Sequence, residues 1–228
     1  YYTNVMINQI NLIISNIETF LLTFTGNVFE VIGWPGLTLL MALESTIIPL
    51  PSEIVMPMAG WKLVLDQNLG QIHILTAGFF GATGCLIGSL VEYYIARVGG
   101  RKFIGKFGKY VLISEKDIVK AENLFNKRGS TIVLIGRMIP GVRGLISIPA
   151  GIAKMNLIKF SIFTFIGSFP WTLGLAWGGY ILGNNYENIR EASKPFDIPI
   201  ILGILAIIII FIWVRVRDIR SSNGKLSQ

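Results

Sequence analysis

The chain has 228 residues, of which 52% are hydrophobic and only 14% are charged, and its mean hydropathy is +0.62. Soluble domains carry about a quarter charged residues, so this composition excludes an ordinary soluble protein and predicts an integral membrane protein. The net charge of +7 gathers at the ends of apolar segments, as the positive-inside rule expects, and does not indicate nucleic-acid binding. With one cysteine and one histidine, neither a disulfide framework nor a metal cluster is expected.

Three segments are apolar and long enough to cross a bilayer as single helices, which takes about 20 residues. They are residues 74–96, 160–182 and 198–214. The N-terminal stretch, residues 1–32, is also apolar, but its apolar part, residues 7–24, is interrupted by asparagines and a glutamate. We expect it to form a helix that either spans the membrane or lies amphipathically in its interface, the second arrangement being favoured.

Two further apolar segments, residues 36–60 and 131–153, are interrupted by prolines. Proline removes a backbone donor and stops helices, and unpaired backbone groups are not tolerated in lipid. Each segment is therefore expected to enter the membrane, turn at its prolines and leave on the same side, as a re-entrant hairpin. The prolines expected to break these hairpins are Pro49, Pro51, Pro57, Pro140 and Pro149.

Residues 97–128 are rich in lysine and arginine and carry apolar residues at helical spacing. They are predicted to form amphipathic helices on the cytoplasmic surface, in contact with anionic lipid. The second hairpin then opens to the cytoplasm, residues 160–182 cross outward, and 198–214 return to a cytoplasmic tail, 215–228. By the same count the first hairpin opens to the outside, so the two hairpins face each other.

A weak internal repeat accompanies these opposite orientations. One shift of the chain aligns four pairs of identical residues: Ile48 with Ile139, Pro49 with Pro140, Ala59 with Ala150, and Gly60 with Gly151. Related halves of opposite orientation are typical of transporters with a site near the midplane. The predicted fold is an all-α integral membrane protein, an inverted repeat with two opposed re-entrant helical hairpins packed among transmembrane helices.

The two hairpins carry opposite charges, Glu44 and Glu53 in the first and Arg137 and Arg143 in the second. An ionisable group at mid-membrane costs about 2.5 to 3.5 kcal/mol on insertion scales, so these groups are expected to pair or to line a polar cavity. One interpretation is that Glu–Arg pairs only hold the hairpins together. The other is that the arginines bind an anion, since guanidinium matches phosphate in a bidentate manner, while the acids carry protons linked to anion release.

Three stretches resemble the DedA family of bacterial membrane proteins, also called the SNARE-associated or VTT-domain family: LESTIIPLPSEIVMPMAG, GRMIPGVRGLISIPAGIAKMNLIKF and FIGSFPWTLGLAWGGYILG. The resemblance covers about residues 33–183 and implies two opposed re-entrant hairpins among helices of the bacterial cytoplasmic membrane. Members are implicated in moving phospholipids between leaflets, and one branch recycles undecaprenyl phosphate, the lipid carrier of cell-wall precursors. Some members are linked to resistance that depends on the proton-motive force.

By position, the acids essential in that family match Glu44 and Glu53, and its essential arginines match Arg137 and Arg143. Many members have a Gly-Asp pair where this chain has a serine, Ser89. Glu92, one helical turn away, is a candidate replacement for the missing acid. It is equally well interpreted as a pairing residue near a helix end.

The leading hypothesis is a proton-motive-force-dependent flippase that returns undecaprenyl phosphate across the cytoplasmic membrane for reuse in cell-wall synthesis. The residues expected to hold the phosphate headgroup are Arg137, Arg143, Gly141, Gly144, Gly151 and Ser147. Alternatives are a flippase or scramblase of another phospholipid, such as phosphatidylethanolamine, and a proton-coupled exporter of small cations with structural arginines. The expected partners are the lipid substrate, membrane lipids and protons, with a homo-oligomer left open.

An enzyme such as a lipid phosphatase is not expected. That chemistry needs a nucleophile beside a base, but the only histidine, His73, lies outside both hairpins, and no GxSxG or HExxH motif is present. No metal or organic cofactor is expected. The tryptophans Trp171, Trp177 and Trp213 are expected to be interfacial or packing aromatics.

Overall fold

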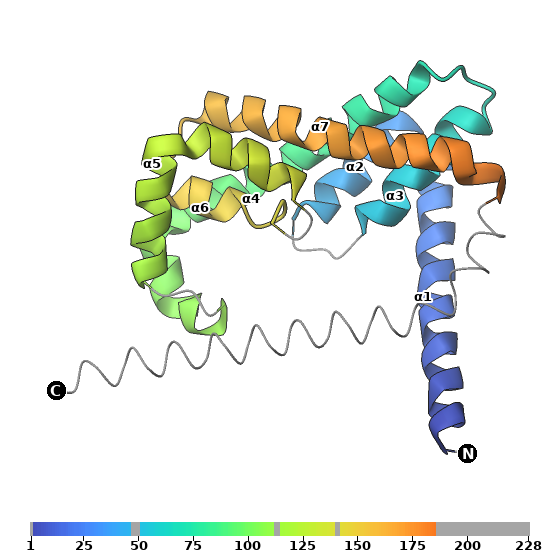
Figure 1. Ribbon diagram of the computed structural model, residues 1–228, viewed down its shortest axis with the longest axis horizontal. Coiled ribbons are helices and arrows are strands. Elements are labelled where there is room, and N and C mark those ends of the chain that lie inside the picture. The colour runs from blue at the N-terminus through green and yellow to red at the C-terminus, as the bar shows by residue number, and fades with distance from the viewer. Residues whose placement is uncertain (1, 47–50, 112–114, 140–141, 186–228) are drawn as a thin grey trace.

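The computed structural model describes residues 2–46, 51–111, 115–139 and 142–185, and this part of the chain is helical with no β-strand (Figure 1). The all-helical fold class is thereby confirmed for the described residues, while the predicted span 198–214 and tail 215–228 lie outside them. The helices are α1 (Tyr2–Ile32), α2 (Trp34–Glu44), α3 (Ser52–Met58), the π-helix η1 (Ala59–Leu65), α4 (His73–Val111), α5 (Glu115–Met138), α6 (Ser147–Ile152), α7 (Leu157–Leu182) and the 3-10 helix η2 (Gly183–Asn185).

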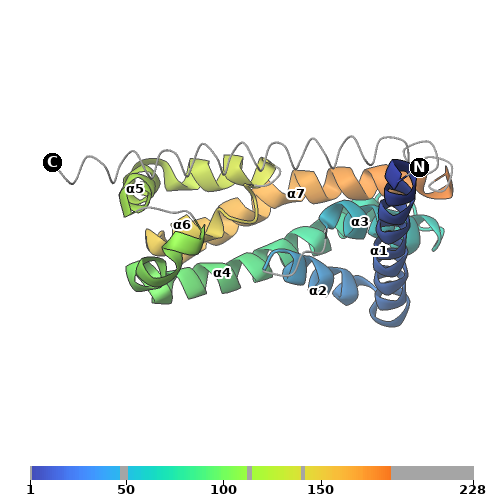
Figure 2. The same cartoon turned by 90° about the horizontal axis from the view of Figure 1, so that it is seen from below.

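The long helices α4 and α7 run side by side in opposite directions through the middle of the fold (Figures 1 and 2). Among the described helices, two are long and apolar enough to cross a membrane, His73–Gly99 within α4 and Leu157–Leu182. These segments coincide with two of the three spans expected from the sequence. α1 lies across them and contacts α2, α3 and η1, where Phe29 joins the buried core.

α4 does not end near residue 96, where the sequence analysis places the start of separate surface helices, but continues to Val111. Residues 97–111 contain no proline, and glycine lowers helix stability by about 1 kcal/mol without blocking a hydrogen bond. The helix therefore continues. The following helix, α5, is broken inside instead, at Arg128, whose φ of −142° and ψ of 30° are not helical.

The first proline-rich segment forms a helix, a break and a second helix. α2 begins after Gly33, whose φ of 65° suits glycine, and ends at Glu44. Residues 45–46 form a turn, and α3 follows the extended residue Pro51; Pro49 lies outside the described residues. Pro57 does not break the segment as predicted, because it lies inside α3, which passes directly into the wider turns of η1.

The second proline-rich segment has the same plan. α5 ends at Met138, residues 142–146 form turns, and α6 follows. Pro149, which was expected to break the hairpin, instead lies in the first turn of α6, where a missing N–H leaves no helical hydrogen bond unmade. The break falls before it, and Pro140 lies outside the described residues.

Both helix–break–helix units pack on the long helices through glycines. In each unit the first helix lies against one long helix and the last part lies against the other, and at each of these contacts a glycine has no room for a side chain. The contacts are Gly84 against Thr38 and Met41, Gly167 against Leu134 and Arg137, Gly60 against Ala176 and Tyr180, and Gly151 against Tyr93 and Arg97. The two residues that face each glycine are three positions apart in the chain in the first two contacts and four positions apart in the last two, so the two units make matching contacts.

Candidate functional site

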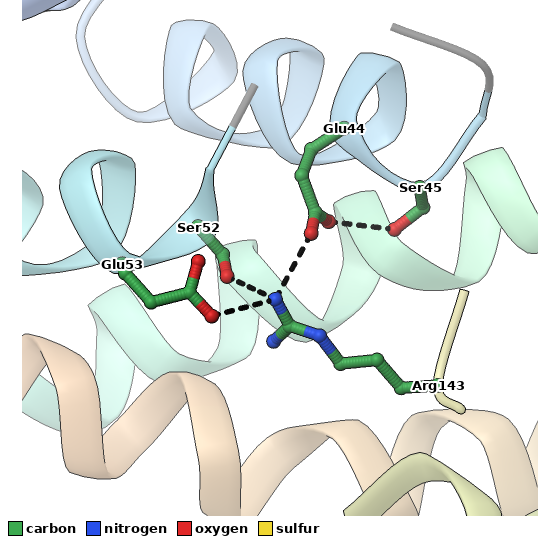
Figure 3. A network of polar contacts seen from close by, with 5 residues as sticks. All are labelled: Glu44, Ser45, Ser52, Glu53 and Arg143. Atoms are coloured by element: carbon green, nitrogen blue, oxygen red, sulfur yellow. Dashed lines mark hydrogen bonds and ion pairs between the residues drawn. The ribbon is translucent and has the colours of Figure 1, made fainter. Parts of the chain in front are cut away.

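Arg143 lies in the turn between α5 and α6 and reaches across to the break between α2 and α3 (Figure 3). Its Nη2 lies 3.1 Å from an oxygen of Glu44 and 3.1 Å from an oxygen of Glu53, and it also donates to the hydroxyl of Ser52. The side chains of Arg143 and Glu44 are 17% and 15% exposed, whereas that of Glu53 is 52% exposed. One arginine of the second unit thus meets both acids of the first, with Glu44 on the inner side and Glu53 at the open side.

Trp171 of α7 completes the surroundings of Arg143. The guanidinium carbon lies 5.0 Å from the centre of the tryptophan ring, which is a cation–π arrangement. The indole Nε1 is buried and has no hydrogen-bond partner among the described residues. From the sequence this tryptophan is expected to be an interfacial or packing residue, although its place in the middle of a predicted span, away from the aromatic belts, is a signal for a different role.

Arg137, at the end of α5, is almost fully buried, with 2% of its surface exposed. Its Nη2 donates a hydrogen bond of 2.6 Å to the Ser147 hydroxyl, and its Nε is buried without a partner among the described residues. No described carboxylate forms an ion pair with it. Of the two arrangements expected for these charges, an ion pair with an acid or a place in a polar cavity, Arg137 shows the second and Arg143 shows both.

Glu92 of α4 lies near Arg137 and Ser147, and the Ser147 hydroxyl accepts the hydrogen bond from Arg137. The Oε2 of Glu92 is buried with no partner among the described residues. Ser89, in contrast, is buried and donates to the Cys85 carbonyl in its own helix. Of these two positions, the structure therefore brings the acid Glu92 near Arg137.

Both arginines line one small enclosed cavity of about 20 Å³. A cavity needs about 10–15 Å³ to hold a water molecule, so this one has room for a single small polar group. Its walls are Glu44, Ser45, Cys85, Arg137, Arg143, Gly144, Ser168 and Trp171. The cavity thus combines two guanidinium groups and a buried indole N–H, and of its walls Cys85, Ser168 and Trp171 were not among the predicted site residues.

The remaining predicted headgroup residues divide into three cases. Gly144 lines the cavity, where a Cβ would meet no atom within 4 Å. Gly151 does not reach it, because it is buried against the backbone of α4 and serves close helix packing. Gly141 lies outside the described residues.

A second, larger hollow starts at Glu53. It is an apolar groove of about 300 Å³ between α1, α3, η1 and α7, and its walls include Leu22, Ile54, Met58 and Leu175. On the α7 side the wall includes several glycines, and at two of them a Cβ would meet no atom within 4 Å. They are Gly174 and Gly178. The groove therefore owes part of its width to missing side chains.

Comparison with known proteins gives consistent matches. The VTT domain matches residues 50–181. A Bacillus subtilis (strain 168) protein named undecaprenyl phosphate transporter A is 35% identical over 185 residues, which cover 81% of this chain and 88% of that protein. The uncharacterized membrane protein YkoX of the same organism is 35% identical over 200 residues, covering 87% of this chain and 86% of that protein.

A Lactococcus lactis subsp. lactis (strain IL1403) relative named alkaline phosphatase-like protein is 35% identical over 192 residues, covering 81% of this chain and 88% of that protein. No solved structure matches the chain at a significant level. The domain match includes Glu53, Arg137 and Arg143 and confirms the resemblance seen in the sequence. The chain belongs to the VTT-domain family of membrane proteins, also known as the DedA family.

Proposed function

We propose that the chain is a flippase that carries undecaprenyl phosphate across the cytoplasmic membrane and returns this lipid carrier to cell-wall synthesis. The observation that carries the proposal is the cavity in which Arg137 and Arg143 meet. Two relatives that share most of this chain are named undecaprenyl phosphate transporter A, from Bacillus subtilis and Staphylococcus aureus. The proposal extends that named substrate to this protein.

The donors at the cavity are suited to a phosphate. Arg137 Nε and Trp171 Nε1 are buried donors without an acceptor among the described residues. An unmade buried hydrogen bond costs about 1–3 kcal/mol, so an incoming phosphate oxygen would recover stabilisation that the empty site lacks. Guanidinium also remains charged at any accessible pH, which keeps the site attractive to an anion.

Proton coupling follows from competition for Arg143. Glu44 and Glu53 occupy the same guanidinium nitrogen that would bind the phosphate. Protonation of these acids on the outer side would release Arg143 to the phosphate, and loss of the protons on the inner side would restore the ion pairs and expel it. This order of events would draw on the proton-motive force and drive inward transport.

The apolar groove is suited to a lipid tail. It begins at Glu53, next to the ion pairs, and its volume of about 300 Å³ lies at the lower end of the range for pockets that bind small molecules. A lipid whose phosphate reaches Arg143 would extend its first prenyl units along Gly174 and Gly178. A cation exporter would have no use for such a groove.

The proposal includes an inverted repeat of two re-entrant hairpins, α2–α3 and α5–α6. Matched glycine contacts on α4 and α7 support related halves, and the breaks before Ser52 and Ser147 support hairpins that turn inside the membrane. If α4 and α7 cross the bilayer, α1 would lie along its surface, since α1 runs across them (Figure 2). This is the interfacial arrangement favoured by the sequence.

A transporter is favoured over an enzyme, although one relative is named alkaline phosphatase-like. Among the described residues, no group of three histidine, cysteine, aspartate or glutamate side chains is placed to hold a metal ion. The hydroxyls nearest the arginines, Ser52 and Ser147, are bonded to them, and no histidine lines the cavity to act as their base. The arrangement is suited to binding a phosphate, and no nucleophile placed to attack it is evident among the described residues.

The test is translocation of undecaprenyl phosphate in proteoliposomes, with and without an inward pH gradient, for the native chain, Arg137→Gln and the exposed-site control Lys62→Gln. We expect transport that responds to the gradient, falls to background in Arg137→Gln and is unchanged in the control. Phosphatidylethanolamine is measured in parallel. If it alone is moved, the substrate assignment is wrong; if neither lipid is moved by a folded native chain, the lipid-transport proposal fails.

A further inference from the structure

A basic pocket of about 440 Å³ lies at the N-terminal end of α7, at the other end of that helix from the apolar groove. Four cationic side chains line it: Lys127, Arg128, Lys154 and Lys159. Its apolar walls are Phe125, Ala153 and Met155, so the pocket combines a charged rim with a partly apolar lining. It shares no residue with the cavity at Arg137.

The backbone adds to the positive character of this pocket. α5 is broken at Arg128, so a new helical segment starts at Gly129, which lines the pocket together with the next two residues. α7 starts beside it, after Asn156, whose side chain accepts from the Lys159 N–H. The N-terminus of a helix carries a partial positive charge and free N–H groups, so two helix starts face the same space as the four cations.

No described acid balances these charges. None of the residues that line the pocket is aspartate or glutamate, and the four cations form no ion pair within the described part of the chain. Like charges gathered in one hollow repel each other and raise the local concentration of anions. The charge and the backbone of the pocket thus both favour an anion.

We infer that this pocket binds the phosphate group of an anionic membrane lipid, separately from the transport cavity. α7 is long and apolar enough to cross a bilayer, so the pocket at its start lies at the level of lipid headgroups. Basic pockets at this level are suited to anionic headgroups. The apolar lining from Phe125 and Met155 favours a lipid over a free anion, because it can receive the start of an acyl chain.

The test measures binding to the full chain in an uncharged detergent by native mass spectrometry. The probes are dioctanoyl phosphatidylglycerol, dioctanoyl phosphatidylcholine and inorganic phosphate. We expect phosphatidylglycerol to bind roughly tenfold or more tightly than phosphatidylcholine, and the double variant Lys154→Gln/Lys159→Gln to remove that preference. Lys62→Gln, an exposed lysine outside the pocket, is the control and should keep it.

Equal binding of the two lipids by the native chain would overturn the inference, as would an unchanged preference in the double variant. Inorganic phosphate that binds as tightly as phosphatidylglycerol would show a site for the free anion and overturn the lipid assignment. Because the lysines are exposed, thermal unfolding of the double variant is expected at the native temperature. Binding by Arg137→Gln should be normal, which separates this pocket from the proposed transport function.

Discussion

Arg137 and Ser147 are joined by a hydrogen bond of 2.6 Å across the break between α5 and α6. The arginine is 2% exposed and the serine is fully buried, so this bond fixes both the guanidinium and the first residue of α6. Glu92 of α4 lies near both residues, so this bond joins α5 and α6 beside an acid of a third helix. The position of Arg137 therefore depends on a residue that need not touch the substrate.

Ser147→Ala is expected to lower the free energy of unfolding by about 1–3 kcal/mol, because it leaves a buried guanidinium donor unsatisfied. A guanidinium that is no longer held in place should also bind phosphate less tightly. A loss of about 1.4 kcal/mol in that affinity corresponds to a factor of ten, so we expect undecaprenyl phosphate transport to fall by about tenfold. Ser161→Ala is the matched control, because that hydroxyl bonds only to the Leu157 carbonyl in its own helix. Thermal unfolding and proteoliposome transport are the measurements. If both variants behave alike, Ser147 does not position Arg137.

Substitutions in the Glu44–Arg143 ion pair are expected to have non-additive effects on the free energy of unfolding. Each single change to glutamine should destabilise the fold by about 1–3 kcal/mol, less than the 3–5 kcal/mol of a fully buried pair, because both side chains are partly exposed. The double variant should be more stable than the sum of the single effects predicts. A double-mutant cycle on unfolding free energies measures this coupling, and strictly additive effects would show that the pair does not hold the two units together.

Glu44→Gln is also expected to change the coupling to protons. A glutamine resembles the protonated acid and cannot re-form the ion pair with Arg143 on the inner side. Transport should then lose its response to the pH gradient while lipid exchange without a gradient continues. Proteoliposome assays at several gradients provide the measurement. A normal gradient response in Glu44→Gln would assign proton coupling to another acid, with Glu92 the first to be tested.

The sequence was sufficient to single out the charged residues and to predict two of the long apolar helices, but it did not predict where the proline-rich segments turn. Glu44, Glu53, Arg137 and Arg143 stand out because ionisable residues are costly in apolar segments. Proline position was misread, because proline stops a helix in its interior but is tolerated in the first turn, as at Pro149. Whether a proline is interior depends on where the helix starts, and no local signal marked that start.

Side-chain partners were equally hard to predict. Arg137 and Arg143 look equivalent in sequence, yet only Arg143 reaches the acids, because it lies in the turn while Arg137 is held at the end of α5. Gly151 and Gly144 also look alike, but one packs against α4 and the other lines the cavity. Such differences arise from the packing of segments distant in the chain, which a single sequence does not record.

Gly178→Leu is expected to block the proposed tail groove. A Cβ at this position would meet no atom within 4 Å, and leucine favours a helix more than glycine does, so the fold should be retained. Transport should fall by at least about tenfold if the tail must occupy the groove. Gly70→Leu, an exposed open position in a loop, is the control. Normal transport by Gly178→Leu would show that the tail takes another path.

Labelling of introduced cysteines tests the expected orientation. The loop before α4 and the start of α7 lie at opposite ends of the antiparallel pair, so they should face opposite sides of the membrane. In cells, Gln67→Cys should react with a membrane-impermeant maleimide added outside, and Lys159→Cys only after permeabilisation. Cys85, the single native cysteine, is buried and should give little background. The reverse pattern would invert the topology, and labelling of both from one side would exclude opposed hairpins.

Replacing Gly60 or Gly151 by alanine, which adds a single methyl group, is expected to destabilise the fold. Each lies against the backbone of a long helix, the carbonyl of Ala176 for Gly60 and that of Tyr93 for Gly151, so that a methyl group would force the helices apart. Alanine at either position should lower the free energy of unfolding by about 1–3 kcal/mol, as overpacking does. Gly174→Ala, where the methyl group meets no atom, should instead be neutral or stabilising by about 0.5–1 kcal/mol. Similar losses at Gly60 and Gly151 in thermal unfolding would support related halves, whereas a loss at one position alone would contradict the inverted repeat.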